Sequence, residues 1–314
     1  MNVLEELKIF YEKFGGEKGE KGEKNIEGES RKKRINRVKY ANCEKGEIGR
    51  TAKGTPIYYF AVKKTERPVI IAQYSIHARE YICTYLCMMQ IKDFLRRGRR
   101  GTVYFIPAAN PDGIAAAIYE NPLFKANANG VDLNVNFDAR WGTGEKNVFS
   151  AGAENYVGKF PFSENETRAL RDFTLKIKPQ ATLSYHSKGE EIYWEFHQDA
   201  ARRKRDYEIA KAVSLSTGYP LLSAGNSAGG YKDWCVEKLK IPAVTIEAGS
   251  DALVHPIGKE HAKEIFMRNA GTIEAVINAL AAMNSQKKIL NEKKEGYGNK
   301  IYARGDKRSN PREG

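Results

Sequence analysis

Short apolar runs alternate with longer helical patterns along most of this chain of 314 residues. The runs that predict strands are 57–62, 69–72, 103–107, 181–186, 191–194 and 242–247. Helical periodicity is found in 2–14, 79–97, 164–177, 200–217, 229–240 and 260–284. Because helices separate most of the strands, we expect an α/β fold whose mixed or mostly parallel sheet is covered on both faces. The sequence NPDG at 110–113 predicts a turn.

The two ends of the chain differ in composition from its middle. Residues 15–35 read GGEKGEKGEKNIEGESRKKRI and contain almost nothing to bury, which is typical of a disordered or loop segment. Residues 285–314 are again polar and charged, and we expect a disordered tail there. The predicted organisation is therefore an N-terminal helix and low-complexity segment at 1–37, one folded domain at 38–284, and the tail.

The net charge of +13 does not indicate a nucleic-acid-binding protein. More than half of it lies in residues 1–40 and 285–314, which carry +3 and +5. The chain shows no zinc-finger spacing and no basic helix with interleaved aromatic residues. We therefore expect no specific nucleic-acid partner.

Features of export and membrane insertion are missing from the sequence. No apolar run approaches the ~18–20 residues that cross a bilayer, and the N-terminus lacks the pattern of a signal peptide. The four cysteines, with no CxxC motif among them, are interpreted as reduced thiols: Cys43, Cys83, Cys87 and Cys235. These features predict a cytoplasmic protein without a membrane span.

One motif points to metal chemistry. The segment SIHARE at 75–80 follows an apolar strand pattern and opens a helix, so that His77 and Glu80 can face one point. His186, at the end of another predicted strand, offers a third ligand. Two histidines, one carboxylate and a water form a common catalytic zinc set. The HxxE spacing alone is also compatible with a surface histidine beside a helix-start glutamate.

A series of motifs resembles the zinc carboxypeptidase family of metallopeptidases, in the family's order and over about 45–280. These motifs are EIGRTAKGTPIYYFAV, SIHARE, NPDG, ANGVDLNVNF, FPFSENET, SYHSKGEEIYW, AGGYKDW and IPAVTIEAG. The resemblance implies a single α/β domain with an eight-stranded mixed sheet flanked by helices. It also implies one Zn²⁺ per chain, bound by His77, Glu80 and His186.

The resemblance implies two catalytic side chains. Glu247 ends an apolar strand, 14 residues after Asp233, as the family's catalytic base does. It would take a proton from a zinc-activated water and deliver it to the leaving amine. Lys125 stands where the family carries an arginine that stabilises the oxyanion, although lysine offers one compact charge instead of a fork. The alternatives are a solvated glutamate at a strand end and a solvated loop lysine.

Departures from the family pattern concern the substrate. Digestive-type members have Asn-Arg where this chain has Asn134-Val135, so the bidentate grip on a terminal carboxylate is gone. Gly225 stands where those enzymes carry a tyrosine. Lys232 stands where the family has the residue at the base of its specificity pocket, and there it would favour an anion unless its ammonium extends to solvent. The candidate substrate-binding residues are Asn134, Lys232, Arg79 and Ser187, with Arg140 as a further clamp.

The segments GGYKDW, TIEAG and KANANGVDLN resemble one bacterial branch of the family in particular, the γ-D-glutamyl-diaminopimelate peptidases. Their substrate carries carboxylates on both sides of the scissile amide. We therefore expect a peptide substrate, a stem peptide of peptidoglycan, cut by zinc-activated water. Two alternatives stay open: a general cytosolic metallocarboxypeptidase or amidohydrolase acting on other acidic peptides or N-acyl amino acids, and a binding protein with an inactive site. The sequence makes no prediction of the oligomeric state.

Overall fold

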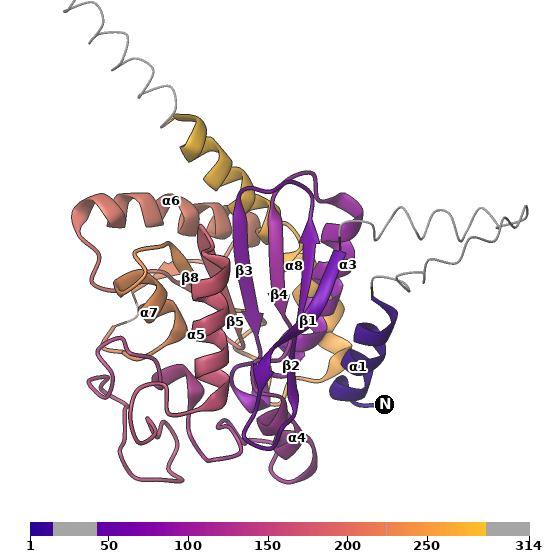
Figure 1. Cartoon of the computed structure of the whole chain (residues 1–314), viewed down its shortest axis with the longest axis vertical. Helices are drawn as coiled ribbons and strands as arrows, with labels where there is room; N and C mark the ends of the chain where they lie inside the picture. The colour runs from indigo at the N-terminus through magenta and orange to yellow at the C-terminus, as the bar shows by residue number, and fades with distance from the viewer. Residues whose placement is uncertain (15–42, 224, 287–314) are drawn as a thin grey trace, which may run out of the picture.

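The computed structural model describes residues 1–14, 43–223 and 225–286. Within them, one mixed sheet has the strand order β1-β2-β4-β3-β5-β8-β6-β7 (Figure 1). The strands are β1 (Cys43–Arg50), β2 (Pro56–Lys63), β3 (Val69–Tyr74), β4 (Thr102–Ile106), β5 (Ala181–His186), β6 (Glu191–Tyr193), β7 (Leu221–Leu222) and β8 (Ala243–Glu247). Its centre, β4-β3-β5-β8, is parallel, while β1-β2, β2-β4 and β6-β8 pair antiparallel. The eight-stranded mixed sheet implied by the resemblance is confirmed.

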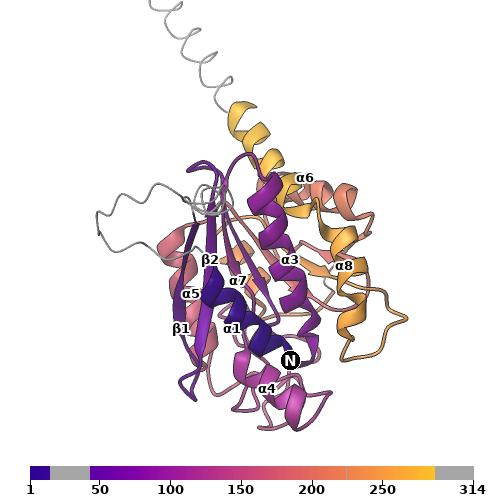
Figure 2. The same ribbon diagram turned by 90° about the vertical axis from the view of Figure 1, so that its right-hand side faces the viewer.

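Helices cover both faces of the sheet (Figures 1 and 2). One core contains residues of α1 (Val3–Lys13), α3 (Ile82–Arg97), α6 (Ala200–Thr217), α8 (Ala262–Asn269) and the helical stretch 272–286. The opposite core contains residues of α5 (Asn165–Ile177) and α7 (Tyr231–Glu237). In β3, Ile70 and Ala72 belong to the first core and Ile71 to the second, which explains why this central strand is apolar throughout.

The N-terminal helix α1 is packed into the domain. Asn2 caps it by accepting hydrogen bonds from the N–H groups of Leu4 and Glu5, and Glu5 reaches back to Asn2 as in a capping box. Val3 and Leu7 are buried in the core that α3 also lines. The predictions for 15–35 and for the tail beyond 286 concern residues outside the described ranges.

The prediction of a turn at 110–113 is wrong. These residues begin α4 (Pro111–Tyr119), because Asn110 accepts a hydrogen bond from the N–H of Gly113 (3.0 Å) and acts as the helix cap. Pro111 occupies the first helical position, where the missing N–H costs nothing and the ring presets φ. A turn pattern and a capped helix start share the same residue types, and the apolar stretch that follows decides between them.

Other boundaries differ modestly from the sequence-based expectation. The helix expected at 260–284 is divided into η3 (Lys259–His261), α8 and the stretch 272–286. The strands β1 and β7 were not predicted, since β1 is a polar edge strand and β7 has only two residues. No helix in the described ranges is long and apolar enough to cross a membrane. All four cysteines lie in the described part of the chain, and each is a free thiol.

Candidate active site

Three of the predicted site residues lie at the carboxyl ends of three adjacent parallel strands. His77 follows β3 and caps the one-turn helix η1 (Ala78–Glu80), His186 ends β5, and Glu247 ends β8. The strands β5 and β8 pair in register, with His186 opposite Glu247. Since parallel strands end at the same edge of a sheet, these side chains meet above it, which is the usual position of a site in an open α/β sheet.

The two histidines and Glu80 converge on one point. Nδ1 of His77 lies 2.8 Å from Oε1 of Glu80, and Nδ1 of His186 lies 3.0 Å from Oε2 of the same carboxylate. The two Nδ1 atoms are 3.2 Å apart. In the described ranges, only these three residues form a group of metal-ligand side chains, with their ligand atoms within 4.8 Å of one another, and all three are buried.

This donor set fits zinc. Two neutral imidazoles and one carboxylate are ligands that Zn²⁺ prefers, and three protein ligands leave one coordination position open for chemistry. The ligand atoms of the three buried side chains lie close enough together to share one cation. The geometry of His77, Glu80 and His186 is therefore that of a cation site.

Asp132 fixes the orientation of one ligand. Its Oδ1 atom lies 3.2 Å from Nε2 of His77, and its side chain is buried at the start of η2 (Leu133–Val135). A carboxylate at Nε2 holds the proton there and leaves Nδ1 free to bind metal. Sequence analysis missed this role, although Asp132 lies inside the GVDLN motif that supported the family resemblance.

Lys125 reaches the same group from the loop after α4. Its Nζ atom lies 2.8 Å from Oδ2 of Asp132 and donates a hydrogen bond to Oδ1 of Asn155 (2.7 Å). Its carbonyl oxygen accepts a hydrogen bond from the N–H of Ala78 (3.0 Å), which ties this loop to η1. Lys125 thus stands beside the predicted metal ligands, and its charge is paired with a buried carboxylate.

A cavity of about 500 Å³ opens next to these residues. Its lining brings together the predicted residues His77, Lys125, Asn134, Lys232 and Glu247. Asp132, Val135, Glu145, Lys146, Asn147, Asn155, Tyr193, Asn226 and Asp233 also line it. Its size is that of a small-molecule or short-peptide site, for which ~300–1,000 Å³ is typical. Several of the additional lining residues are on loops whose sequence has no periodic pattern, so sequence analysis did not find them.

The environment of Glu247 suits proton transfer. Burial, followed by the negative charge of Glu80, raises the pKa of Glu247 to about 8. For Glu80, burial acts in the opposite direction, but His77 and His186 hold the pKa of this carboxyl well below its usual range. Two carboxylates in one cleft thus differ in proton affinity, which is the pattern expected when one binds a cation and the other exchanges protons.

Lys232 is buried in α7 and is already paired. Its Nζ atom lies 2.6 Å from Oδ1 of Asp233 and donates a hydrogen bond to the carbonyl oxygen of Glu195 (2.8 Å). Asn134 holds the start of the same helix, since its Oδ1 atom accepts a hydrogen bond from the N–H of Tyr231 (3.2 Å). Both side chains face the cavity, but each also stabilises the wall in which it lies.

The other candidate substrate-binding residues are not among the described residues that line this cavity. Arg79 pairs with Glu154 (3.1 Å), and Arg140 pairs with Glu237 (3.2 Å). Ser187 donates its backbone N–H to Oε2 of Glu80 (3.3 Å), so it contacts one of the predicted metal ligands.

A close backbone approach shapes one wall. At Gly229, φ is +89°, and an added Cβ would lie 2.7 Å from the carbonyl oxygen of Val135. Only glycine fits at this point without strain. The loop before α7 can therefore lie directly against η2, which brings Asn226 and Lys232 to the same cavity as Asn134.

Comparison with known proteins places this site in context. A family model described as zinc carboxypeptidase matches residues 33–279. Gamma-D-glutamyl-L-diamino acid endopeptidase 1 of Lysinibacillus sphaericus is 29% identical over 221 residues, which are 59% of this chain and 55% of that protein. Murein peptide amidase A of Escherichia coli (strain K12) is 29% identical over 234 residues, 70% of this chain and 84% of that protein.

The fold agrees with these matches. A solved structure of bovine thrombin-activatable fibrinolysis inhibitor in complex with tick carboxypeptidase inhibitor has a TM-score of 0.70 at 21% identity, and the match covers 79% of this chain and 94% of that chain. The chain spans only about half the length of the Lysinibacillus relative. Because the family model matches well over half of the sequence, this chain belongs to the zinc carboxypeptidase family.

Proposed function

We propose that the protein is a zinc peptidase that hydrolyses the amide between D-glutamate and meso-diaminopimelate in stem peptides of peptidoglycan. The observation that carries the proposal is a cavity in which His77, which is grouped with the other two predicted metal ligands, and Glu247 lie together with three lysines. Such a cleft suits a substrate with a carboxylate on each side of the scissile bond. The names of two relatives, a γ-D-glutamyl-diamino acid endopeptidase and a murein peptide amidase, support the same substrate class.

Zinc is the metal that the family implies, and His77, Glu80 and His186 would hold it. When bound, zinc supplies a Lewis acid that polarises a carbonyl and activates water. Glu247 stands across from His186 and would take the proton of the attacking water, then pass it to the nitrogen of the leaving amine. The raised pKa of Glu247 matches this double use, because the carboxyl can both accept and return a proton near neutral pH.

Lys125 is the proposed source of positive charge at the developing oxyanion. It lines the cavity, and the carboxylate of Asp132 contacts both Lys125 and His77. A positioned cation of this kind contributes most when charge appears in the transition state. Its ion pair with Asp132 also keeps the ammonium in place before substrate binds.

The charges of the cleft indicate which residues would bind the carboxylates of the substrate. Lys125 and Lys232 each have a carboxylate partner, Asp132 and Asp233 respectively. Lys146 lines the same cavity and is exposed, with no ion pair to any residue of the described ranges. We therefore assign one substrate carboxylate to Lys146, with Lys232 and the amide of Asn134 as secondary contacts.

A general metallocarboxypeptidase or amidohydrolase remains the second candidate. The likeness to carboxypeptidase structures favours it, since it shows that the fold accommodates such enzymes. Val135, however, cannot grip a terminal carboxylate, and it lines the cavity beside Asn134. A binding protein with an inactive site is disfavoured because the three predicted ligands are grouped and one of them, His77, lines the same cavity as Glu247.

Incubation of the zinc-loaded protein with L-Ala-γ-D-Glu-meso-diaminopimelate, followed by mass spectrometry, tests the proposal. The expected products are L-Ala-D-Glu and free diaminopimelate. Hippuryl-type dipeptides serve as the comparison. Rapid cleavage of hippuryl substrates with an intact tripeptide would replace the proposal by the second candidate, and cleavage of neither would contradict both.

A further inference from the structure

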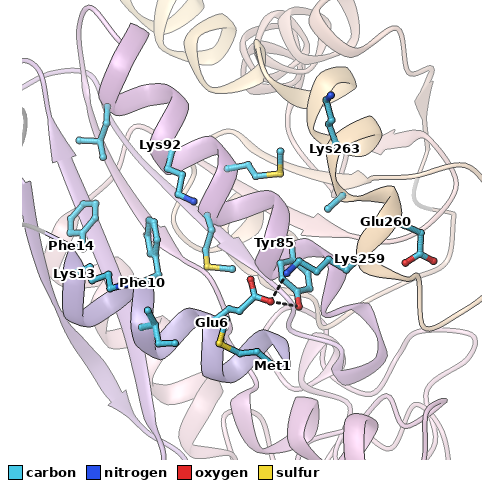
Figure 3. Close-up of a pocket in the computed structure, with 15 residues that line it drawn as sticks. Met1, Glu6, Phe10, Lys13, Phe14, Tyr85, Lys92, Lys259, Glu260 and Lys263 are labelled. Carbon is cyan, nitrogen blue, oxygen red and sulfur yellow. Dashed lines mark hydrogen bonds and ion pairs between the residues drawn. The ribbon is translucent and has the colours of Figure 1, made fainter.

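A second cavity, of about 580 Å³, is separate from the cleft. It is formed by α1, α3 and the segment η3–α8, which all lie on the same side of the sheet (Figures 2 and 3). It shares no lining residue with the cavity that His77 and Glu247 line. Nothing in the proposed peptidase chemistry uses it.

The floor of this cavity is apolar. Side chains of α1 and α3 face each other across it, with Phe10 on α1 and Tyr85 on α3 (Figure 3). The apolar lining residues include Met1, Ile9, Phe10, Tyr85, Met88 and Met89. Methionine is unbranched and adapts to the shape of what it contacts, so this floor suits a flexible apolar chain.

The charged residues around the floor are mostly lysines. Four lysines line the cavity against two glutamates: Lys13, Lys92, Lys259, Lys263, Glu6 and Glu260. Lys259 pairs with Glu6, which also accepts a hydrogen bond from the hydroxyl of Tyr85 (3.3 Å), as the dashed lines of Figure 3 show. The remaining three lysines make no ion pair with any residue in the part of the chain that the structure describes.

Lys92 brings one of these positive charges next to the apolar floor. Its Nζ atom lies 5.4 Å from the centroid of the Phe10 ring, so the ammonium stands directly over the apolar floor. The Lys92 side chain is exposed, while that of Phe10 is half-buried. An apolar trough with unpaired cations along it is complementary to a molecule that has a long apolar tail and an anionic head.

We propose that this cavity binds a free fatty acid, with its tail along the α1–α3 floor and its carboxylate at the unpaired lysines. The volume falls within the ~300–1,000 Å³ of small-molecule sites, and the enclosure by three elements favours a single free chain over a flat lipid surface. The tail gains from removal of apolar surface from water, and the head gains from charge-assisted hydrogen bonds.

Isothermal titration calorimetry of the full chain with dodecanoate tests this proposal. The matched probes are hexanoate, which shortens the tail, and dodecyltrimethylammonium, which reverses the head charge. We expect dodecanoate to bind one-to-one and at least ten-fold more tightly than either. No binding of dodecanoate below its micellar range, or equal binding of both twelve-carbon probes, would overturn the proposal.

Two triple variants locate the binding site. Replacing Lys13, Lys92 and Lys263 by methionine should weaken dodecanoate binding at least ten-fold. The control replaces Lys176, Lys204 and Lys211, which are exposed lysines outside both cavities, and should change affinity less than two-fold. Equal effects of the two triple variants would mean that net charge alone attracts the probe.

Met89→Glu tests the apolar floor, because it places a carboxylate beside the tail. This variant should abolish dodecanoate binding while circular dichroism confirms the fold. Binding that survives the substitution would contradict the assigned floor.

Discussion

Asp132 lies behind His77, with its Oδ1 atom 3.2 Å from the Nε2 atom of the ring. Because this carboxylate orients the imidazole and raises its basicity, Asp132→Asn should weaken zinc binding about 10–100-fold. Competition with a chelator of known affinity measures the change. Asp138→Asn, an exposed aspartate a few residues further on, is the matched control and should leave zinc affinity as it is. Unchanged zinc affinity in Asp132→Asn would remove Asp132 from the metal site.

Lys146 gives the sharpest test of how the cleft reads its substrate. Lys146→Met should lower kcat/KM by roughly one to two decades for a peptide that ends in diaminopimelate, since a hydrogen bond to a charged group is worth about 1.5–3 kcal/mol. The same peptide with L-lysine in place of diaminopimelate lacks one carboxylate and should be affected little. Lys159→Met removes an exposed charge from the same loop outside the cavity, and both peptides should then be cut as by the wild type. Equal losses on both peptides in Lys146→Met would show that Lys146 does not read the extra carboxylate.

Glu166 makes stability depend on pH. Burial, and then the charges of Glu164 and Asp112, raise the pKa of Glu166, whose Oε1 atom has no hydrogen-bond partner among the described residues. The folded protein therefore holds this proton more tightly than the unfolded chain does. Glu166 stabilises the fold fully at a pH below the usual glutamate value of about 4.3, and this contribution is lost as the pH rises through the raised pKa.

Glu166→Gln should accordingly raise Tm at pH 7.5 by roughly 2–4 °C and leave it nearly unchanged at pH 4. The hydrogen bond that Asn127 donates to Oε2 (3.2 Å) can be kept by the glutamine oxygen. Thermal unfolding at the two pH values measures the difference, with Glu208→Gln on the exposed face of α6 as control. A lower Tm for Glu166→Gln at pH 7.5 would mean that the charge of Glu166 is needed in the fold.

The meeting of three candidate site residues at one edge of the sheet was predictable because they lie at or just after strand ends. His77, His186 and Glu247 each follow an apolar run, and parallel strands bring such ends to one edge whatever the loops do. The fold class followed from the same alternation of strands and helices. These features depend on local sequence pattern and on general rules of sheet geometry, so they can be predicted from a sequence.

Pair contacts were not predictable in the same way. That Lys125 meets Asp132 depends on a loop folding back onto η1, and that Lys146 reaches the cleft depends on a long irregular segment. Lys232 was expected in the pocket, but its pairing with the adjacent Asp233 depends on side-chain directions that no periodicity reveals. The partners of a charge therefore have to be read from the structure, even where its place can be inferred.

The proposed zinc hydrolysis with Glu247 as its base is tested by the turnover of L-Ala-γ-D-Glu-meso-diaminopimelate by the wild type and by Glu247→Gln, with zinc content measured in the same samples. Glutamine keeps the shape of Glu247 and cannot take a proton, so we expect equal zinc in both proteins and a turnover number lower by ~10²–10⁴ in the variant. A Glu247→Gln protein that keeps its zinc and cuts the tripeptide as fast as the wild type would contradict it.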